Sequence, residues 1–135
     1  MVKMTGTYNG DKRCTAQHEP SQSNLETDAP KDNHGRGEKF SPTDLVGTAL
    51  GTCILTTLAI VYEKEGLSFA GSTFSVVKEM TPPPRKIASL KIVIHLPKAI
   101  PVELREKIAH SAEACPVRRS LHADINAPIE IQYIL

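Results

Sequence analysis

Apolar and polar positions divide the chain into a strand-rich N-terminal part, one long uncharged helix and a mixed C-terminal half. Short segments at residues 2–8, 13–18 and 25–28 have the length and composition of strands. Asn9-Gly10-Asp11 between the first two predicts a hairpin turn. Residues 29–39 combine Pro, Asn, Gly and charges without periodicity, which predicts a long loop.

A helix is predicted to begin after Ser41 and to end near Glu65, where Gly66 stops it. Ser41 is a cap, Pro42 takes the first helical position, and Asp44 completes a pattern close to a capping box. Residues 45–62 carry no charge, which is nearly the length of a membrane span. Glycines and threonines dilute this run, so we interpret it as a helix buried on all sides.

Two glycines of this helix, Gly47 and Gly51, share one face. Because glycine has no side chain, this face predicts close contact with another helix or with a sheet.

The C-terminal half alternates between strand and helix patterns. Residues 71–80 and the alternating run 90–96 predict two strands, separated by three consecutive prolines. Pro101 opens a second helix, Cys115-Pro116 interrupts it, and residues 129–133 form a final strand. We therefore predict a single α+β domain with helices packed on an antiparallel sheet, divided into residues 1–40, 41–65 and 66–135.

Composition excludes several classes of function. The 135 residues include 40% hydrophobic and 23% charged residues, with a formal net charge of +1, so no electrostatic feature favours nucleic acid or an anionic membrane. The N-terminus lacks an apolar stretch of signal-peptide length. Three cysteines, an odd number, argue against a secreted disulfide framework. We expect a cytoplasmic protein in which any disulfide is transient.

The cysteines are the strongest candidates for chemistry. Cys53, deep in the uncharged helix, is either a small buried hydrophobe or a reactive thiol, and reactivity would need a cation from elsewhere in the fold. Cys115 precedes Pro116, where a new helical turn begins, so backbone N–H groups are expected to face its sulfur. Its alternative interpretation is a helix-end residue tucked against the core. Cys14 is an incidental third thiol. No histidine spacing and no Cys-x-x-Cys pair indicates a metal, and no bound cofactor is expected.

Two segments around these cysteines are informative together. One is Thr27-Asp28-Ala29-Pro30 followed by Phe40-Ser41-Pro42-Thr43-Asp44-Leu45-Val46-Gly47-Thr48-Ala49-Leu50-Gly51-Thr52-Cys53. The other is Ala112-Glu113-Ala114-Cys115-Pro116-Val117 with Ser120-Leu121. In order and spacing they resemble the two cysteine motifs of the OsmC/Ohr family, and the likeness extends over nearly the whole chain.

This resemblance implies an OsmC-like fold, in which an intertwined homodimer packs long central helices together and forms its sites at the subunit interface. It also implies that the Cys53 thiolate attacks a peroxide and that Cys115 resolves the resulting sulfenic acid as a disulfide. A small thiol or a lipoyl-type dithiol would then act as the external reductant. The implied function is reduction of hydroperoxides, chiefly organic ones, in defence against oxidative stress.

One position departs from the family pattern. Peroxidases of the family carry a glutamate directly after the proline that starts the helix, paired with an arginine that supports the thiolate, and here that position is Thr43. Asp44 is adjacent but points about half a turn away from Cys53 on a helix. Arg13 is our first candidate for the arginine and Arg36 the second, and we expect this arginine to be held less firmly without its carboxylate.

Two functional hypotheses follow from these features. The intact cysteine motifs favour a thiol-dependent hydroperoxide reductase. Thr43 favours the alternative, a non-catalytic or redox-sensing small-molecule binder with the same fold.

Overall fold

The computed structural model describes residues 1–135, which form two compact units, Met1–Val46 and Gly47–Leu135. The first unit holds an antiparallel sheet in the order β1-β2-β3, with β1 at Met4–Gly10, β2 at Arg13–His18 and β3 at Ser23–Asp28. The second unit holds a separate three-stranded sheet and most of the helical residues. The predicted α+β class is confirmed.

The first hairpin turn lies one residue later than its sequence signal. Asp11 and Lys12 are the central residues, with φ of 51° and 61°, values that match a type I′ turn and suit the twist of the flanking strands. Gly10 pairs with Arg13 across this turn. The predicted long loop is present after β3, and its only regular element is the 3₁₀ turn η1 at Lys31–Asn33.

Helix α1, Pro42–Tyr62, starts with the predicted cap. The backbone N–H of Ser41 donates to Asp44 Oδ2 at 2.8 Å, and the Asp44 N–H donates to Ser41 Oγ at 3.1 Å. This reciprocal arrangement satisfies two backbone donors at the helix start, as in a capping box. The helix continues as a 3₁₀ turn, η2 at Glu63–Glu65, and ends at Gly66 with φ of 84°.

Burial of α1 differs from the expectation for a helix buried on all sides. Leu50, Ile54 and Leu58 are fully buried, whereas Thr52 and Ile60 on the opposite face are exposed. Within one chain, therefore, α1 is buried along one face only. By length and composition alone, Pro42–Glu65 could also cross a membrane, although the core helix of a protein in water passes the same test.

The sheet of the second unit is mixed rather than antiparallel as predicted. Strand β4 (Thr73–Met80) pairs antiparallel with β5 (Ile87–Leu96), whereas β5 pairs parallel with β6 (Ile129–Tyr133). The chain between β5 and β6 crosses over as 3₁₀ turn η3 (Val102–Leu104), α2 (Arg105–Glu113) and α3 (Pro116–Ser120). A helical crossover returns the chain to the same end of the sheet, which makes β6 parallel to β5.

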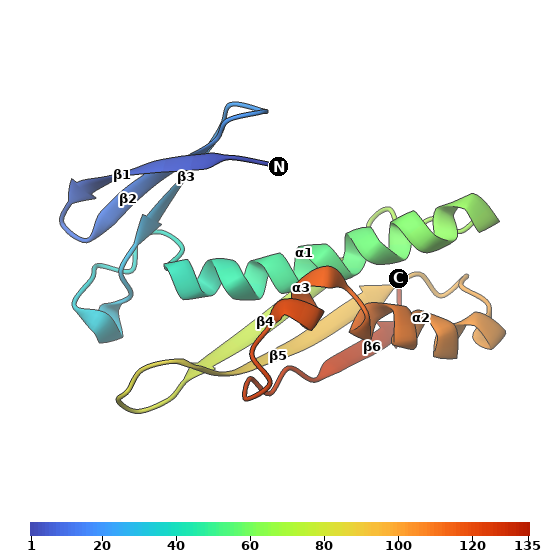
Figure 1. The fold of residues 1–135 in the computed structure, drawn as a ribbon. Coiled ribbons are helices and arrows are strands. Elements are labelled where there is room, and N and C mark those ends of the chain that lie inside the picture. The colour runs from blue at the N-terminus through green and yellow to red at the C-terminus, as the bar shows by residue number, and fades with distance from the viewer. The chain divides into compact units, whose positions relative to one another are not determined.

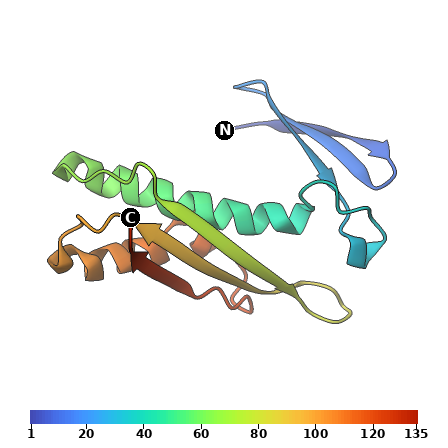
Figure 2. The ribbon, with the colours of Figure 1, turned by 180° about the vertical axis from the view of Figure 1, so that it is seen from behind.

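The glycine face of α1 packs on this sheet. A Cβ atom on Gly51 would lie 2.7 Å from Cγ of Phe74 and closer still to other atoms of that ring, and one on Gly47 would lie 3.3 Å from Cγ1 of Val76. The glycines therefore admit side chains of β4, and of the two predicted kinds of close contact, with a helix or with a sheet, the chain makes the one with a sheet. Figure 1 shows α1 along the sheet with α2 beside it, and Figure 2 shows the long β4–β5 hairpin from behind.

Candidate active site

Cys53 lies on α1 at the boundary between its buried and exposed faces. Its side chain is half-buried, and its Sγ lies 4.0 Å from Thr57 Oγ1, one turn further along the helix. Gly51 and Ile54 beside it face the sheet. Packing of α1 on β4 and β5 therefore fixes the position of Cys53 while leaving its sulfur partly accessible.

Cys115 lies where α2 ends and α3 begins, and it is fully buried. Pro116 opens α3, and Cys115 itself caps it, because the backbone N–H of Arg118 donates to Cys115 Sγ at 3.4 Å. The expectation that N–H groups face this sulfur is confirmed. Ile108 and Ala112, also fully buried, hold the same face of α2 against the core.

The fold brings the two thiols together. Burial raises the pKa of the Cys115 thiol, and the hydrogen bond and negative charge of the neighbouring Cys53 raise it further. The backbone N–H groups of Arg118 and Val117 oppose this rise in part. The interaction places the side chains of Cys53 and Cys115 next to each other in the folded chain. All cysteines are free thiols in this structure.

This arrangement assigns different chemistry to the two sulfurs. Cys115 is buried and keeps its proton, so it can donate a hydrogen bond to a thiolate at Cys53. Cys53 is the more accessible of the two, so a reagent from solution meets it first. Cys14 is exposed on β2, opposite Tyr8 and Thr27, and belongs to the other unit. The geometry thus separates an accessible thiol from a buried, proton-holding one.

Arg13 is anchored by two carboxylates within the N-terminal unit. Its guanidinium forms an ion pair with Glu38 and lies 3.6 Å from Asp28 Oδ2. The hydrogen bond to Glu38 raises the pKa of Arg13, while the backbone N–H of Glu38 and the charge of Arg13 lower the pKa of Asp28, which has no exposed surface. Arg13 is therefore paired with carboxylates of its own unit, although Thr43 offers none.

The remaining sequence candidates have other roles in the structure. Thr43 lies in the first turn of α1, with its Oγ1 3.2 Å from Ser41 Oγ. Arg36 is exposed, and its backbone, not its guanidinium, contributes to the low pKa of Asp28. Of the candidates, the fold joins Cys53 with Cys115.

The sequence interpretation missed Asp28 and Glu38. Asp28 could have been found from register, since a hairpin that pairs His18 with Ser23 also places Arg13 directly opposite Asp28. Opposite charges at such a cross-strand position stabilise the pairing. Glu38 had no signal of this kind, because it belongs to the irregular loop and reaches Arg13 only through the folded path of that loop.

Comparisons with known proteins agree with this architecture. A family model described as OsmC-like protein matches residues 35–130. The crystal structure of a candidate osmotic stress induced and detoxification response protein from Psychrobacter arcticus is 37% identical, with a TM-score of 0.92, over 98% of this chain and 96% of that chain. Among the curated proteins, none matches.

More distant structures share the fold. An organic hydroperoxide resistance protein OsmC from Legionella pneumophila has a TM-score of 0.76 at 14% identity, over 98% of this chain and 96% of that chain. The organic hydroperoxide resistance protein OhrB of Bacillus subtilis has a TM-score of 0.71 at 14% identity, over 98% of both chains. With the family model covering most of the sequence and a relative of high structural similarity, the chain belongs to the OsmC-like family.

Proposed function

We propose that the protein is a thiol-dependent peroxidase that reduces organic hydroperoxides, with Cys53 as the attacking thiol and Cys115 as the resolving thiol. The observation that carries the proposal is the contact between an accessible Cys53 and a buried Cys115 whose pKa is raised. Relatives named for hydroperoxide resistance share the fold and support the same class of activity.

The chemistry uses the two sulfurs in order. The Cys53 thiolate attacks the outer oxygen of R–O–OH, the O–O bond breaks, and the alkoxide takes a proton to leave as an alcohol, so that Cys53 becomes a sulfenic acid. The Cys115 sulfur then attacks the Cys53 sulfur, and the sulfenic hydroxyl leaves with the Cys115 proton as water. Because Cys115 stays protonated until this step, it is a poor nucleophile, and Cys53 reacts with the peroxide first.

Turnover requires an external reductant. Two thiols, supplied as a small thiol or as a lipoyl-type dithiol, return the disulfide to Cys53 and Cys115, so no resident cofactor takes part. A reducing cytoplasm would provide such thiols and suits a protein with free cysteines.

The proposal includes a supporting cation and a homodimeric site. Arg13 is the candidate to stabilise the Cys53 thiolate, and its ion pairs with Glu38 and Asp28 suit it to a fixed position. Arg36 is the second candidate. In the proposed dimer, the exposed face of α1 is covered by a second copy of the chain, and the site lies at that interface.

Intact mass after one equivalent of cumene hydroperoxide tests the thiol roles. The wild-type protein should lose two hydrogens as a disulfide forms, Cys115→Ser should instead gain oxygen at Cys53, and Cys53→Ser should stay unmodified. Cys14→Ser is the matched control and should behave as the wild type, because Cys14 is exposed on a different element. Equal oxidation of the Cys53→Ser variant would contradict the assignment.

Thr43, in place of the family's glutamate, favours one alternative, a redox-sensing binder that reacts once and is not turned over. Repeated turnover of peroxide with dihydrolipoamide would exclude this alternative. A single burst of oxidation without further turnover would support it instead.

A further inference from the structure

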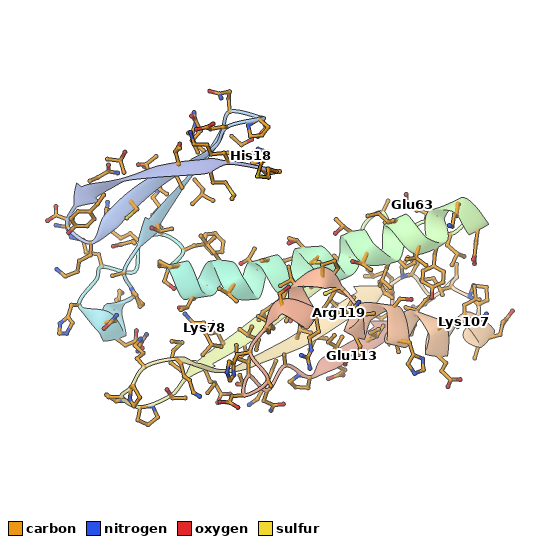
Figure 3. The ribbon with its side chains drawn as sticks, in the orientation of Figure 1. His18, Glu63, Lys78, Lys107, Glu113 and Arg119 are labelled. Carbon is orange, nitrogen blue, oxygen red and sulfur yellow. The ribbon has the colours of Figure 1, made fainter.

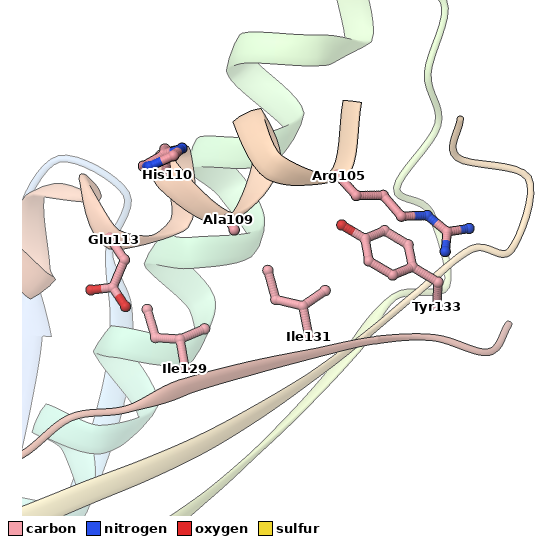
Figure 4. Close-up of a pocket in the computed structure, with 7 residues that line it drawn as sticks. All are labelled: Arg105, Ala109, His110, Glu113, Ile129, Ile131 and Tyr133. Atoms are coloured by element: carbon pink, nitrogen blue, oxygen red, sulfur yellow. The ribbon is translucent and has the colours of Figure 1, made fainter. Parts of the chain in front are cut away.

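A groove on the second unit is left unused by the thiol chemistry. Helix α2 and strand β6 enclose about 420 Å³ between them, lined by the apolar side chains of Ala109, Ile129 and Ile131 and by Tyr133. We call this cavity the α2–β6 groove. Figure 4 shows Ile129, Ile131 and Tyr133 rising from β6 toward Ala109 on α2. Its volume lies in the range of small-molecule sites, roughly 300–1,000 Å³.

The groove is lined by α2 residues other than those that pack with the thiol pair, and neither Cys53 nor Cys115 lines it. Ile108 and Ala112 of α2 face the core with Cys115 and are fully buried, whereas Ala109 is exposed toward the groove. A ligand in the groove would therefore contact neither sulfur, and the inference stands apart from the proposed peroxidase activity.

The charges at the two ends of the groove are unequal. At one end Arg105 donates hydrogen bonds only to the backbone carbonyls of Lys98 and Ile100, at 3.3–3.4 Å, and it forms no ion pair. At the other end Glu113 is paired with Arg118, whose Nε lies 3.4 Å from Glu113 Oε2. The negative charge is therefore balanced within the protein, while the positive charge of Arg105 has no carboxylate partner.

Arg105 is held in place for a ligand. Its guanidinium carbon lies 4.1 Å from the centre of the Tyr133 ring, and this stacking fixes the plane of the group. Its Nη1 makes no hydrogen bond, so donors remain at the groove end shown in Figure 4. A carboxylate is the group that best matches the planar donors of a guanidinium.

Tyr133 adds a second polar feature. Its hydroxyl is buried and makes no hydrogen bond within the protein, a condition that costs free energy unless a partner is supplied. Burial raises the pKa of Tyr133, so the hydroxyl keeps its proton and remains a donor. Arg105, His110 and Glu113 are the other polar side chains of the groove. The unpaired hydroxyl of Tyr133 is a further place for one polar atom of a ligand.

We propose that the α2–β6 groove binds an amphipathic carboxylate, with its anionic head at Arg105 and its medium-length alkyl chain over Ile129 and Ile131. Burial of the ligand's alkyl chain against the apolar lining contributes favourable free energy of binding. An ion pair between the ligand's carboxylate and the guanidinium of Arg105 contributes more. A neutral molecule of the same length would leave the charge of Arg105 unmatched, so the site discriminates by head group.

Isothermal titration with sodium decanoate, decanol and sodium acetate tests this proposal on the whole chain. Decanoate should bind at one site, and both decanol, which lacks the charge, and acetate, which lacks the chain, should bind at least about tenfold more weakly. Arg105→Gln should weaken decanoate binding by about tenfold or more and leave decanol unchanged. Arg119→Gln is the matched control, since Arg119 is exposed on α3 and does not line the groove (Figure 3).

Three results would overturn the proposal. They are no decanoate binding at millimolar concentration, decanol binding as tight as decanoate binding, or equal loss of affinity in the Arg105→Gln and Arg119→Gln variants. The first would leave the groove to a second copy of the chain or another protein. If Arg105→Gln does not fold, as judged by circular dichroism, the contrast between decanoate and decanol on the wild type still decides.

Discussion

Two features of Cys115 affect its reactivity, namely its complete burial and the neighbouring sulfur of Cys53. Both raise the pKa of its thiol, so the reactive thiolate forms only at higher pH than for an ordinary cysteine. The same features keep alkylating reagents from its sulfur. These properties belong to the folded chain and disappear on unfolding.

Alkylation of the reduced protein with iodoacetamide should therefore label Cys14 and Cys53 before Cys115. The order follows their accessibility, since Cys14 is exposed, Cys53 half-buried and Cys115 buried. Labelling of Cys115 should rise late as the pH increases, and peptide mass spectrometry measures each rate. In urea the three rates should converge, and a Cys115 rate equal to that of Cys14 in the folded protein would contradict the burial argument.

Asp28 predicts a pH-dependent contribution to stability. Its folded-state pKa lies below the ordinary aspartate value because of the Glu38 backbone N–H and Arg13, so its carboxylate stabilises the fold above the ordinary pKa. That contribution is lost as the pH falls through the lower folded pKa. Asp28→Asn should lower the melting temperature at pH 7, and the difference from wild type should shrink in acid.

Glu65→Gln provides the control for this measurement, because Glu65 is exposed in η2 and forms no ion pair. It should change the melting temperature little at any pH. If the melting temperature of Asp28→Asn stays below that of the wild type by the same amount down to about pH 2, the loss of stability comes from altered packing and not from the lost charge.

At the residue scale the sequence predicted the cysteines better than their surroundings. Cys53 and Cys115 were identified by local motifs, and the fold brings them into contact. Arg13 was a candidate from the sequence and stays one, but its partner Glu38 was not foreseen, because a loop residue finds its contact through tertiary structure that no local pattern encodes. The other partner of Arg13, Asp28, could have been predicted from the register of the β2–β3 hairpin, which places the two residues opposite each other.

Helix α1 and strand β4 depend on each other at Gly51. A methyl group there would clash with the Phe74 ring, while at Gly47 it would meet Val76 and Leu90 at 3.3–3.4 Å, which small shifts can relieve. Gly51→Ala should destabilise the protein by about 1–3 kcal/mol through overpacking. Gly47→Ala should be close to neutral, since alanine favours the helix by about 1 kcal/mol and offsets the tighter contact.

Urea unfolding measures both glycine variants. Adding Phe74→Leu to Gly51→Ala should recover part of the loss, because the smaller side chain leaves room for the methyl group. Equal stability of Gly47→Ala and Gly51→Ala would mean that the helix does not pack on β4 as described.

At the element scale, strong local signals were sufficient for most boundaries. The cap of α1 fixed its start, and the alternation of residues 129–133 located β6. The direction of β6 was wrong, since alternation predicts a strand but does not say which neighbour it joins. The parallel pairing with β5 follows from the helical crossover, a long-range feature.

At the scale of the whole molecule, a single chain leaves one uncharged face of α1 exposed. Thr52 and Thr56 use their hydroxyls inside the helix, donating to the carbonyls of Thr48 and Thr52 at 3.0 Å, so their methyl groups face outward. Ile60 continues this face and is 78% exposed. An uncharged face of this kind is expected to be covered by a partner.

If a second copy of the chain covers this face, the wild-type protein should have twice the monomer mass by light scattering. Ile60→Glu should shift the measured mass toward that of the monomer, because a buried unpaired carboxylate opposes association. Val102→Glu is the matched control, since Val102 is 71% exposed but lies on η3, away from α1. A monomeric wild type would remove the homodimeric site, and co-flotation with lipid vesicles would instead make the bilayer the partner of α1. Loss of peroxide turnover in Ile60→Glu along with the dimer, with Val102→Glu retaining both, would tie the thiol chemistry to the assembly.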